Sequence, residues 1–576
     1  MRRLFKKAYC SRTRARIKAI VQDTQLGVLK GGYETGVHAM RSLSLEARQK
    51  GEGILLFDFA NAFNTVDRNL MMSLAARLCP ELANLTWWLY KLQPWLVTSR
   101  DDVIRSSSGT QQGCRLSNPL FALMMQFIAE KLQTVDGLRK PLFFWDDTAL
   151  VGTPEALLEA TNILKECASE TGLQLKWKKC HLHGLPLTID KCKSLPFPTM
   201  MTFHNNFNME YLKAPIGDDQ FVHAWLNEKI KTLKKIVSLL SSMPHKHEAA
   251  TLLRSTAAVC RVVYLMRILP PLQTSAFIVE FDTVVRSGFE EILGISMNDL
   301  WWEIAKLPAK YGGMGWKTGS HVSGAHYIAS LAKTFDSVVN IIPDHDAERI
   351  AKRDAAEWLQ NFAPPNVTVE SMIRAIRNPR NPKPNLSAIN LSTAQQCDEW
   401  HWQKLVPRLS DRELFHVLAH SGPTNWWVSC PPLEYKKWNL PPAKWVASAR
   451  RRLFLDVIPA EQQCSYCHHQ RCDTKGNHAV MCGSGPSRIW RHNSIRDLVA
   501  KAIENVGYRI GTEHNGGLTD DRRPGDIIVY NWVGDKHLLI DIGVTSPLAA
   551  HNRSSLLREG PGGGGGRYRE EEEALL

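Results

Sequence analysis

The hydrophobic positions of this chain fall into short runs, and one run is interrupted by two adjacent acids. It covers residues 143–151 and carries Asp146 and Asp147 among aromatic and aliphatic neighbours. The pattern predicts a β-hairpin with a strand on each side and the acids at the tight turn between them. Unpaired buried carboxylates are costly, so two of them at one point indicate a divalent cation. Solvated acids in an ordinary turn are the alternative, since Asp is common in turns.

Two further stretches have a clear pattern. Residues 53–59 predict a buried strand whose apolar run ends at one acid, Asp58. Residues 221–268 carry apolar side chains at helical spacing, which predicts helices. The spaced apolar residues are Ile230, Leu233, Val237 and Leu240.

The composition is that of a globular protein with a basic surface. The 576 residues are 44% hydrophobic, and the formal net charge is +14. The length allows more than one domain, and the positive charge suits a phosphate-backbone partner. The 13 cysteines show no disulfide framework, which indicates a reducing compartment. We find no apolar run long enough to span a bilayer and no signal-peptide core, so we expect no membrane partner.

Four motifs follow one another in the first third of the chain. A strand ends at Asp58, a loop rich in Gly and Gln covers residues 108–121, the hairpin with paired acids comes next, and residues 171–180 end in Lys179-Cys180. In this order and spacing they resemble motifs A, B, C and D of the palm of a reverse transcriptase, specifically that of non-LTR (LINE-type) retrotransposons. Any one of these motifs would be weak evidence, whereas four in order are strong evidence.

The resemblance implies a two-metal polymerase site. Asp58 and Asp146 would bridge two Mg²⁺ ions and Asp147 would support the pair, because in-line phosphoryl transfer needs closely spaced carboxylates. Mg²⁺ is the expected metal, since it binds carboxylates, water and substrate phosphates together. Lys179 stands at the motif D position and would protonate the departing pyrophosphate. A solvated surface lysine is the alternative interpretation.

The resemblance also assigns nucleotide-binding residues. Phe63 stands where the family places an aromatic ring beneath the sugar, so deoxynucleotides would be preferred; ordinary core packing is the alternative. Gln112 would contact the incoming nucleotide or the template, and Gly113 would permit close backbone approach. Two positions depart from the family: Trp145 replaces a residue that is usually small, and Arg115 replaces the proline usual after the Gln-Gly pair. Neither change removes a metal ligand.

The expected fold is α+β: a right-hand polymerase followed by a helical connector, a zinc knuckle and a partial α/β restriction-like nuclease domain. The family's upstream finger strands would precede Met1, so we expect a polymerase truncated at its N-terminus. The expected domains are partial fingers over residues 1–50, palm over 51–220, helical thumb and post-thumb segment over 221–335, connector over 336–445, zinc knuckle over 446–490, partial nuclease over 491–550 and a low-complexity tail over 551–576.

Three smaller features belong to the same resemblance. Residues 211–217 look like the motif E hairpin that grips the primer, and the basic residues of segment 221–268 fit a thumb that holds the template–primer duplex. A solvated basic helix face accounts for some of those residues in any case. Residues 306–315 form a motif that recurs after the thumb in these elements, without an assigned mechanism.

Cysteine and histidine spacing predicts a metal site closer to the C-terminus. Cys464, Cys467, His478 and Cys482 form the pattern C-x2-C-x10-H-x3-C. Three thiolates and one imidazole make a closed tetrahedral site for structural Zn²⁺. The ligand set is open by one member, because three further candidates lie nearby: Cys472, His468 and His469.

Two acid-bearing strands are predicted after this knuckle. Asp526 follows a Pro-Gly pair, and Asp541 lies in the apolar run 538–544. With the knuckle they resemble the restriction-like endonuclease domain of one class of non-LTR retrotransposons, in which two acids bind the metal that cleaves target DNA. That fold also needs a later lysine, and none follows Lys536, so we expect an incomplete nuclease. A small α/β domain whose acids cap strands is the alternative.

The function implied by the resemblance is RNA-directed DNA polymerisation by a non-LTR retrotransposon protein. Its partners would be template RNA, target DNA that supplies the primer, and deoxynucleoside triphosphates. It would act in the nucleus, although no import signal is evident, and the sequence does not give its oligomeric state. The alternative is a catalytically inactive, nucleic-acid-binding remnant of such an element. A polymerase that copies DNA, or one that makes RNA, is a third interpretation, and Phe63 argues against RNA synthesis.

Overall fold

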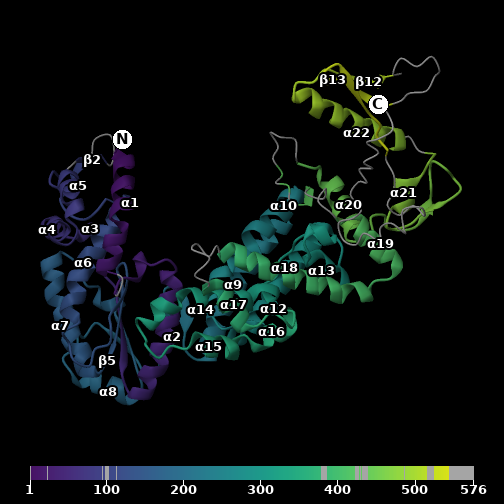
Figure 1. Ribbon diagram of the computed structural model, residues 1–576. Coiled ribbons are helices and arrows are strands. Elements are labelled where there is room, and N and C mark those ends of the chain that lie inside the picture. The colour runs from purple at the N-terminus through teal and green to yellow at the C-terminus, as the bar shows by residue number, and fades with distance from the viewer. Residues whose placement is uncertain are drawn as a thin grey trace. The chain divides into compact units, whose positions relative to one another are not determined.

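The computed structural model is an α+β protein in which helices predominate (Figure 1). The structure describes residues 2–21, 24–93, 95–97, 103–111, 113–377, 386–421, 427–428, 430, 432, 439–484, 487–514 and 525–543. Gln112, the Pro- and Asn-rich residues 378–384 and the tail over 551–576 lie outside the described residues. The chain divides into two compact units: Met1–Thr232, Arg261–Phe281 and Gly319–Cys397 form the first, and Leu233–Cys260, Asp282–Thr318 and Asp398–Leu576 form the second.

A five-stranded sheet in the first unit has the order β4-β5-β1-β6-β7. β1 is antiparallel to its neighbours β5 and β6, and it pairs Phe57 with Thr148 and Leu56 with His181. β6 and β7 are parallel. The buried strand and the hairpin predicted from the sequence are both present. The strands are β1 (Gly53–Phe57), β4 (Leu142–Phe144), β5 (Asp147–Gly152), β6 (His181–His183) and β7 (Thr202–His204).

Side chains that alternate along these strands form the main hydrophobic core. Leu55, Phe57 and Leu150 pack in one cluster with helices α6 (Ser117–Leu132) and α7 (Pro154–Thr171). Helix α2 (Gly32–Lys50) contacts β1, β4 and β5 with other residues. Figure 1 shows α7 and α2 on either side of the strands. The sheet is therefore enclosed by helices.

Helix α7 shows how local sequence sets the limits of an element. The Thr153 side chain accepts a hydrogen bond from the Ala156 N–H, and Pro154 occupies the first turn, where its missing N–H costs nothing. The helix ends at Gly172, whose φ of 74° is left-handed and favours glycine. The α7 ends thus follow from the sequence alone.

The first unit also contains a second hairpin, β8 with β9, over the segment that resembles motif E. Leu212 and Lys213 form its turn, with φ of 49° and 64°. The other elements of this unit are α1 (Arg2–Val21), η1 (Leu26–Val28), α3 (Ala62–Thr65), α4 (Arg68–Leu78), α5 (Pro80–Tyr90), β2 (Trp95–Val97), β3 (Val103–Arg105), η2 (Trp177–Lys179), α8 (Pro186–Ser194), β8 (Met209–Tyr211), β9 (Ala214–Ile216), α11 (Val263–Ile268), α14 (Gly319–Val339), α15 (Ala347–Asp354), α16 (Ala356–Phe362) and α17 (Val369–Arg377).

The segment expected to form the thumb is helical, as predicted, and it contributes to both units. In α9 (Asp219–Ser241) the residues Ile230, Leu233 and Val237 are buried, while Leu240 is only half-buried. Helices α9, α12 (Pro271–Leu293) and α18 (Leu386–Leu405) each run from one unit into the other. The domain limits expected from the sequence stay predictions.

The second unit combines a helical part with a small sheet. β12, β13 and β14 form an antiparallel sheet against which α22 packs. The elements are α10 (Lys246–Leu252), η3 (Leu253–Ala257), η4 (Val259–Arg261), α13 (Asp299–Lys306), η5 (Ala309–Tyr311), η6 (Val406–Arg408), α19 (Asp411–Ala419), α20 (Pro442–Arg452), β10 (Gln462–Gln463), β11 (Arg471–Cys472), α21 (Asn477–Met481), α22 (Ser487–Asn505), β12 (Ile510–His514), β13 (Gly525–Val533) and β14 (Lys536–Ile540).

The motif over residues 306–315 has a structural role in the second unit. Arg452 is 1% exposed, and its guanidinium donates to the Gly313 carbonyl from Nε at 3.0 Å and from Nη2 at 2.8 Å. Gly312 has a φ of 81°, and a Cβ there would meet the Val417 carbonyl oxygen at 2.6 Å. The Gly-Gly pair therefore lets the turn pack closely and expose a carbonyl to a buried arginine.

Residues Lys246–Ile268 are long and apolar enough, by composition, to cross a bilayer. The stretch is broken by the π-turn η3 and the 3-10 turn η4. Length and composition alone are weak evidence for a membrane span, because core helices pass the same test.

Candidate active site and metal centre

The strand pairing brings the three acids of the first unit to one end of the sheet. Asp58 directly follows Phe57, which lies opposite Thr148, so Asp58 leaves β1 beside the start of β5. Asp147 opens β5, and Asp146 lies in the turn before it. The three residues are distant in sequence, and the antiparallel register makes them neighbours.

The electrostatics of the acids show that they interact. Burial raises the pKa of Asp146, and the nearby charge of Asp58 raises it further. Burial also raises the pKa of Asp147, to about 6, with Asp146 and Asp58 adding to the shift and Lys213 opposing it. Like charges disfavour ionisation, and a bound cation reverses that effect. Three carboxylates held in this way fit the oxygen ligands that Mg²⁺ prefers.

Lys179 lies at the acid site, as its position in the fourth motif predicted. Its Nζ is 3.1 Å from Oδ2 of Asp58, and the lysine side chain is 62% exposed. The backbone holds the segment in place, because the Lys176 N–H donates to the Asp58 carbonyl at 2.9 Å. An exposed ion pair of this kind contributes at most about 1 kcal/mol to stability. The structure places the ammonium group beside the acids, and its role as a proton donor stays a prediction.

Phe63 is half-buried and stacks on Phe121, with ring centroids 4.3 Å apart and planes 22° from parallel. Its carbonyl accepts from the Thr110 N–H at 2.6 Å, which ties this segment to the loop over residues 108–121. Gly113 has a φ of 74°, and a Cβ added there would meet no atom within 4 Å, so its backbone conformation, rather than a close neighbour, requires glycine. The stacking of Phe63 and the backbone conformation of Gly113 do not test the nucleotide contacts predicted for these residues.

Sequence reasoning missed a residue that holds the turn with the paired acids. Gln25 is 1% exposed, and its Oε1 accepts from the Trp145 N–H at 2.7 Å while its Nε2 donates to the Trp145 carbonyl at 3.3 Å. Trp145 has a φ of 56°, a left-handed conformation that is costly for a bulky residue. The Gln25 amide therefore stabilises a strained residue directly before Asp146. No local sequence signal points to this contact, because Gln25 and Trp145 are 120 residues apart.

The Trp145 indole explains why Gly27 is glycine and forms part of a basic cavity. A Cβ on Gly27 would lie 2.5 Å from Cε2 of the indole. The indole lines a cavity of about 580 Å³ together with one face of α1. Lys7, Arg14, Lys18 and Arg115 contribute four cations, and no described lining residue is acidic. A positive cavity thus adjoins the acidic turn.

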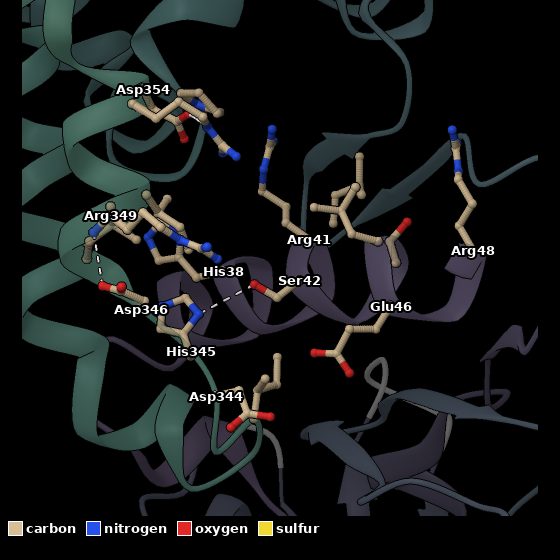
Figure 2. A pocket seen from close by; sticks show the side chains of 18 of the residues that line it. His38, Arg41, Ser42, Glu46, Arg48, Asp344, His345, Asp346, Arg349 and Asp354 are labelled. Atoms are coloured by element: carbon tan, nitrogen blue, oxygen red, sulfur yellow. Dashed lines mark hydrogen bonds and ion pairs between the residues drawn. The ribbon is translucent and has the colours of Figure 1, made fainter. Parts of the chain in front are cut away.

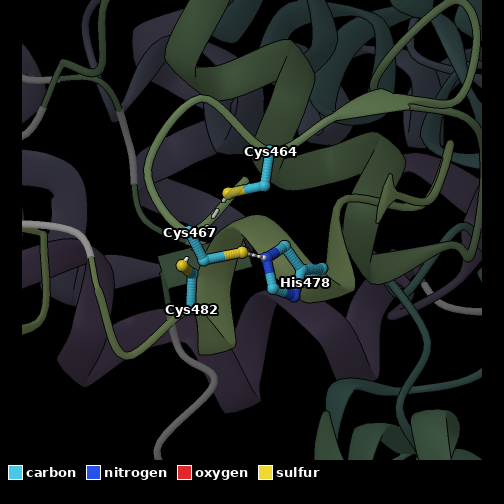
Figure 3. Close-up of side chains that lie close together, drawn as sticks. All are labelled: Cys464, Cys467, His478 and Cys482. Atoms are coloured by element: carbon cyan, nitrogen blue, oxygen red, sulfur yellow. Dashed lines mark hydrogen bonds between the residues drawn. The ribbon is translucent and has the colours of Figure 1, made fainter. Parts of the chain in front are cut away.

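The predicted zinc ligands converge in the second unit, as Figure 3 shows. Sγ of Cys464 lies 3.8 Å from Sγ of Cys482, and Sγ of Cys467 lies 3.3 Å from Nε2 of His478. Backbone N–H groups lower the pKa of Cys464 to about 7, which favours the thiolate. The donor set fits a tetrahedral Zn²⁺ site. Cys472 packs beside it without joining the set, and His468 and His469 are exposed.

The acids predicted for the nuclease remnant lie at one end of the small sheet, where β13 begins and β14 ends. Oδ1 of Asp526 is 3.0 Å from Nε2 of His492, and its Oδ2 accepts from the Ile542 N–H at 2.6 Å. Burial raises the pKa of Asp526, but the Ile542 bond, His492 and Asp541 together lower it below its usual value. The carboxylate already has partners, and the structure assigns it no catalytic role.

Replacement of Gln25 by Met should weaken the acid site without large steric change. We expect a loss of about 2 kcal/mol of stability, because three hydrogen bonds are lost, two to Trp145 and one from the Gly27 N–H. Mn²⁺ binding to the carboxylates, followed by electron paramagnetic resonance, should weaken about fivefold as the turn relaxes. Gln133→Met, at an exposed position, is the matched control. Equal Mn²⁺ affinity in both variants would contradict the role given to Gln25.

Replacement of Cys467 by Ser should abolish stoichiometric zinc, because a serine hydroxyl is a poor ligand in a thiolate site. We expect the wild type and Cys472→Ser to retain one Zn²⁺ per chain by atomic emission after exhaustive dialysis. Loss of zinc in Cys472→Ser alone would show that the ligand set includes Cys472.

A match to a family model covers all three acids of the site. Residues 6–200 match the family model described as reverse transcriptase (RNA-dependent DNA polymerase). No curated protein matches the sequence. A telomerase structure from Candida albicans, in complex with a TWJ fragment of telomeric RNA, is 11% identical with a TM-score of 0.28, and covers 63% of this chain and 55% of that chain. An apo telomerase structure from Candida tropicalis is 10% identical with a TM-score of 0.32, and covers 63% and 60%. This chain thus spans little more than half the length of those telomerases. By the family match, the chain contains a reverse transcriptase domain, the domain of RNA-directed DNA polymerases, over residues 6–200.

Proposed function

We propose that this protein is the reverse transcriptase of a non-LTR retrotransposon and extends a DNA primer on an RNA template. The reverse transcriptase family itself implies Mg²⁺, an RNA template, a DNA primer and deoxynucleoside triphosphates. The observation that carries the proposal is the meeting of Asp58, Asp146 and Asp147 at the end of β1 and β5. The retrotransposon origin is supported by the order of the four motifs and by the knuckle that follows them.

The acids would hold the metals of nucleotidyl transfer. Two Mg²⁺ ions bound by Asp58, Asp146 and Asp147 would stabilise the attacking and leaving oxygens as Lewis acids. Asp58, Asp146 and Asp147 would hold these ions through their carboxylate oxygens. Gln25 would keep the turn in the conformation that presents the two adjacent carboxylates.

Other residues would act on the substrates. Lys179 holds a proton on Nζ beside Asp58 and would donate it to the departing pyrophosphate. The ring of Phe63, fixed on Phe121, would exclude a ribose 2′-hydroxyl. The charge of Lys213, at the tip of the β8–β9 hairpin, reaches Asp147, which supports a primer-gripping role for that hairpin next to the acids. Gln112 would contact the base or template, and Gly113 would let the backbone approach.

Nucleic acid would be the main macromolecular partner. The cations that line the cavity beside Trp145 suit a phosphate backbone. The zinc knuckle would stabilise the second unit. We propose that target DNA supplies the primer. Because that DNA is in the nucleus, the protein would need access to the nucleus. We do not propose active endonuclease chemistry, because Asp526 is already paired with His492.

Primer extension on homopolymeric RNA with Mg²⁺ tests the proposed function directly. We expect Asp146→Asn to lower incorporation about a thousandfold, since metal stabilisation of the transition state is worth several kcal/mol. Asp136→Asn, at an exposed turn, should match the wild type. RNA binding without incorporation in any of the three proteins would favour the inactive, nucleic-acid-binding alternative.

Replacement of Phe63 by Val should relax sugar discrimination. We expect the ratio of kcat/KM for dGTP to that for GTP to fall by at least about tenfold, because a smaller side chain leaves room for the 2′-hydroxyl. Phe127→Val, which shortens another half-buried aromatic residue, serves as the control. An unchanged ratio in Phe63→Val would assign Phe63 to core packing alone.

A further inference from the structure

A second cavity in the first unit has no part in the proposed polymerase chemistry. It has a volume of about 390 Å³ and lies between α2 and the segment 342–354, which leads into and forms α15. Figure 2 shows side chains from α2 on one side of this space and side chains from residues 344–354 on the other. A cavity of this size accommodates a small ligand.

Two buried nitrogen atoms of the lining residues lack hydrogen-bond partners. Nη1 of Arg41 is buried and unpaired, while Nη2 of the same guanidinium donates to Oε1 of Gln273 at 2.8 Å. Nε2 of His345 is also buried and unpaired, and this residue is 7% exposed. Its Nδ1 lies 3.4 Å from the Ser42 hydroxyl, so Nε2 is a donor when Nδ1 accepts from that hydroxyl. Buried polar atoms without partners are rare, and here two of them belong to one cavity.

The acidic lining residues are already engaged by protein groups. Glu46 pairs with Arg139 at 2.7 Å, and Asp354 accepts from Arg353 at 2.7 Å and from the Tyr327 hydroxyl at 2.8 Å. Asp346 and Asp218 each accept backbone N–H bonds that begin the helices after them. Asp344 is the one acidic lining residue with no such partner among the described residues.

Three of the arginines that line the cavity lack an acidic partner among the described residues. Within the described part of the chain, no carboxylate lies at ion-pair distance from Arg41, Arg48 or Arg349, and all three line the cavity. Burial, with the nearby charges of Arg41 and His345, lowers the pKa of His38 to about 3. Among the residues that the structure describes, three arginines of the cavity thus have no ion-pair partner, and Asp218, Asp344 and Asp346 have none either, because a backbone N–H bond is not an ion pair.

We propose that this cavity binds a phosphate oxyanion through Arg41, Arg48, Arg349 and His345. Arginine presents planar N–H groups that match phosphate oxygens, and the unpaired Nη1 and Nε2 atoms are donors of the required kind. The oxyanion belongs either to a small soluble phosphate compound or to the backbone of a nucleic acid. Asp58 directly follows the last residue of β1, whereas α2 ends just before the first residue of β1, Gly53. The cavity beside α2 is therefore separate from the acids, and binding there does not depend on polymerase activity.

Inorganic pyrophosphate is a suitable probe, titrated calorimetrically into the zinc-loaded full chain in buffer free of Mg²⁺ and Mn²⁺, so that the carboxylates cannot bind it through metal. We expect saturable binding that Arg48→Gln and Arg349→Gln each weaken roughly tenfold, the size of a charge-assisted hydrogen bond. Arg77→Gln, an exposed arginine on α4, should change the affinity less than twofold. Arg41→Gln should weaken binding further, and the exposed-site variants decide the question if that buried substitution unfolds the protein.

A second arm separates the two sources of the oxyanion. Displacement of pyrophosphate by a single-stranded RNA 12-mer would identify a nucleic-acid backbone as the ligand, and failure to displace it would identify a small phosphate compound. No pyrophosphate binding at about 10 mM, or binding that neither Arg48→Gln nor Arg349→Gln weakens more than Arg77→Gln does, would overturn the proposal.

Discussion

Repulsion among Asp58, Asp146 and Asp147 is the constraint on which the first unit depends. Burial and the charge of Asp58 raise the pKa of Asp146, and burial and both neighbouring charges raise the pKa of Asp147, so the fold must hold these acids in place by other means. The β1–β5 register supplies the framework, and the Gln25 amide holds the turn between β4 and β5. The strained φ of Trp145 is tolerated because this amide bonds both its N–H and its carbonyl. Electrostatic strain of this kind is relieved when a divalent cation binds.

Charge is distributed unevenly within the same unit. Acids gather at the end of β1, cations without acids among the described residues line the cavity next to Trp145, and arginines and acids together line the cavity beside α2. Metals are attracted to the first region, and phosphate groups to the cations of the two cavities. The net charge of +14 therefore matters less than its distribution, because the acidic site could not hold phosphate without metal. Lys179 forms an ion pair with Asp58, and the charge of Lys213 opposes the rise in the pKa of Asp147, so both lysines place positive charge beside the acids.

The second unit uses its polar residues mainly to stabilise structure. The cysteine–histidine set joins short segments that share little hydrophobic core, a common solution in small domains. Arg452 is buried yet satisfied by backbone carbonyls of the 306–315 motif, which gives that motif a physical explanation. Asp526 is likewise bound to His492 and to a backbone N–H, an arrangement that favours the structural interpretation of this acid over a catalytic one.

The sequence by itself determined whatever depends on local pattern. The acid hairpin, the strand before Asp58, the helical segment after residue 220 and the spacing of the zinc ligands all follow from residues close together in the chain, and the structure contains each of them. Tertiary structure alone decided the contact of Gln25 with Trp145, 120 residues away, and the union of α2 with α15 around one cavity. Such contacts have no local signal, because they arise when whole helices and strands pack. Only this packing determines which charged groups remain without a partner.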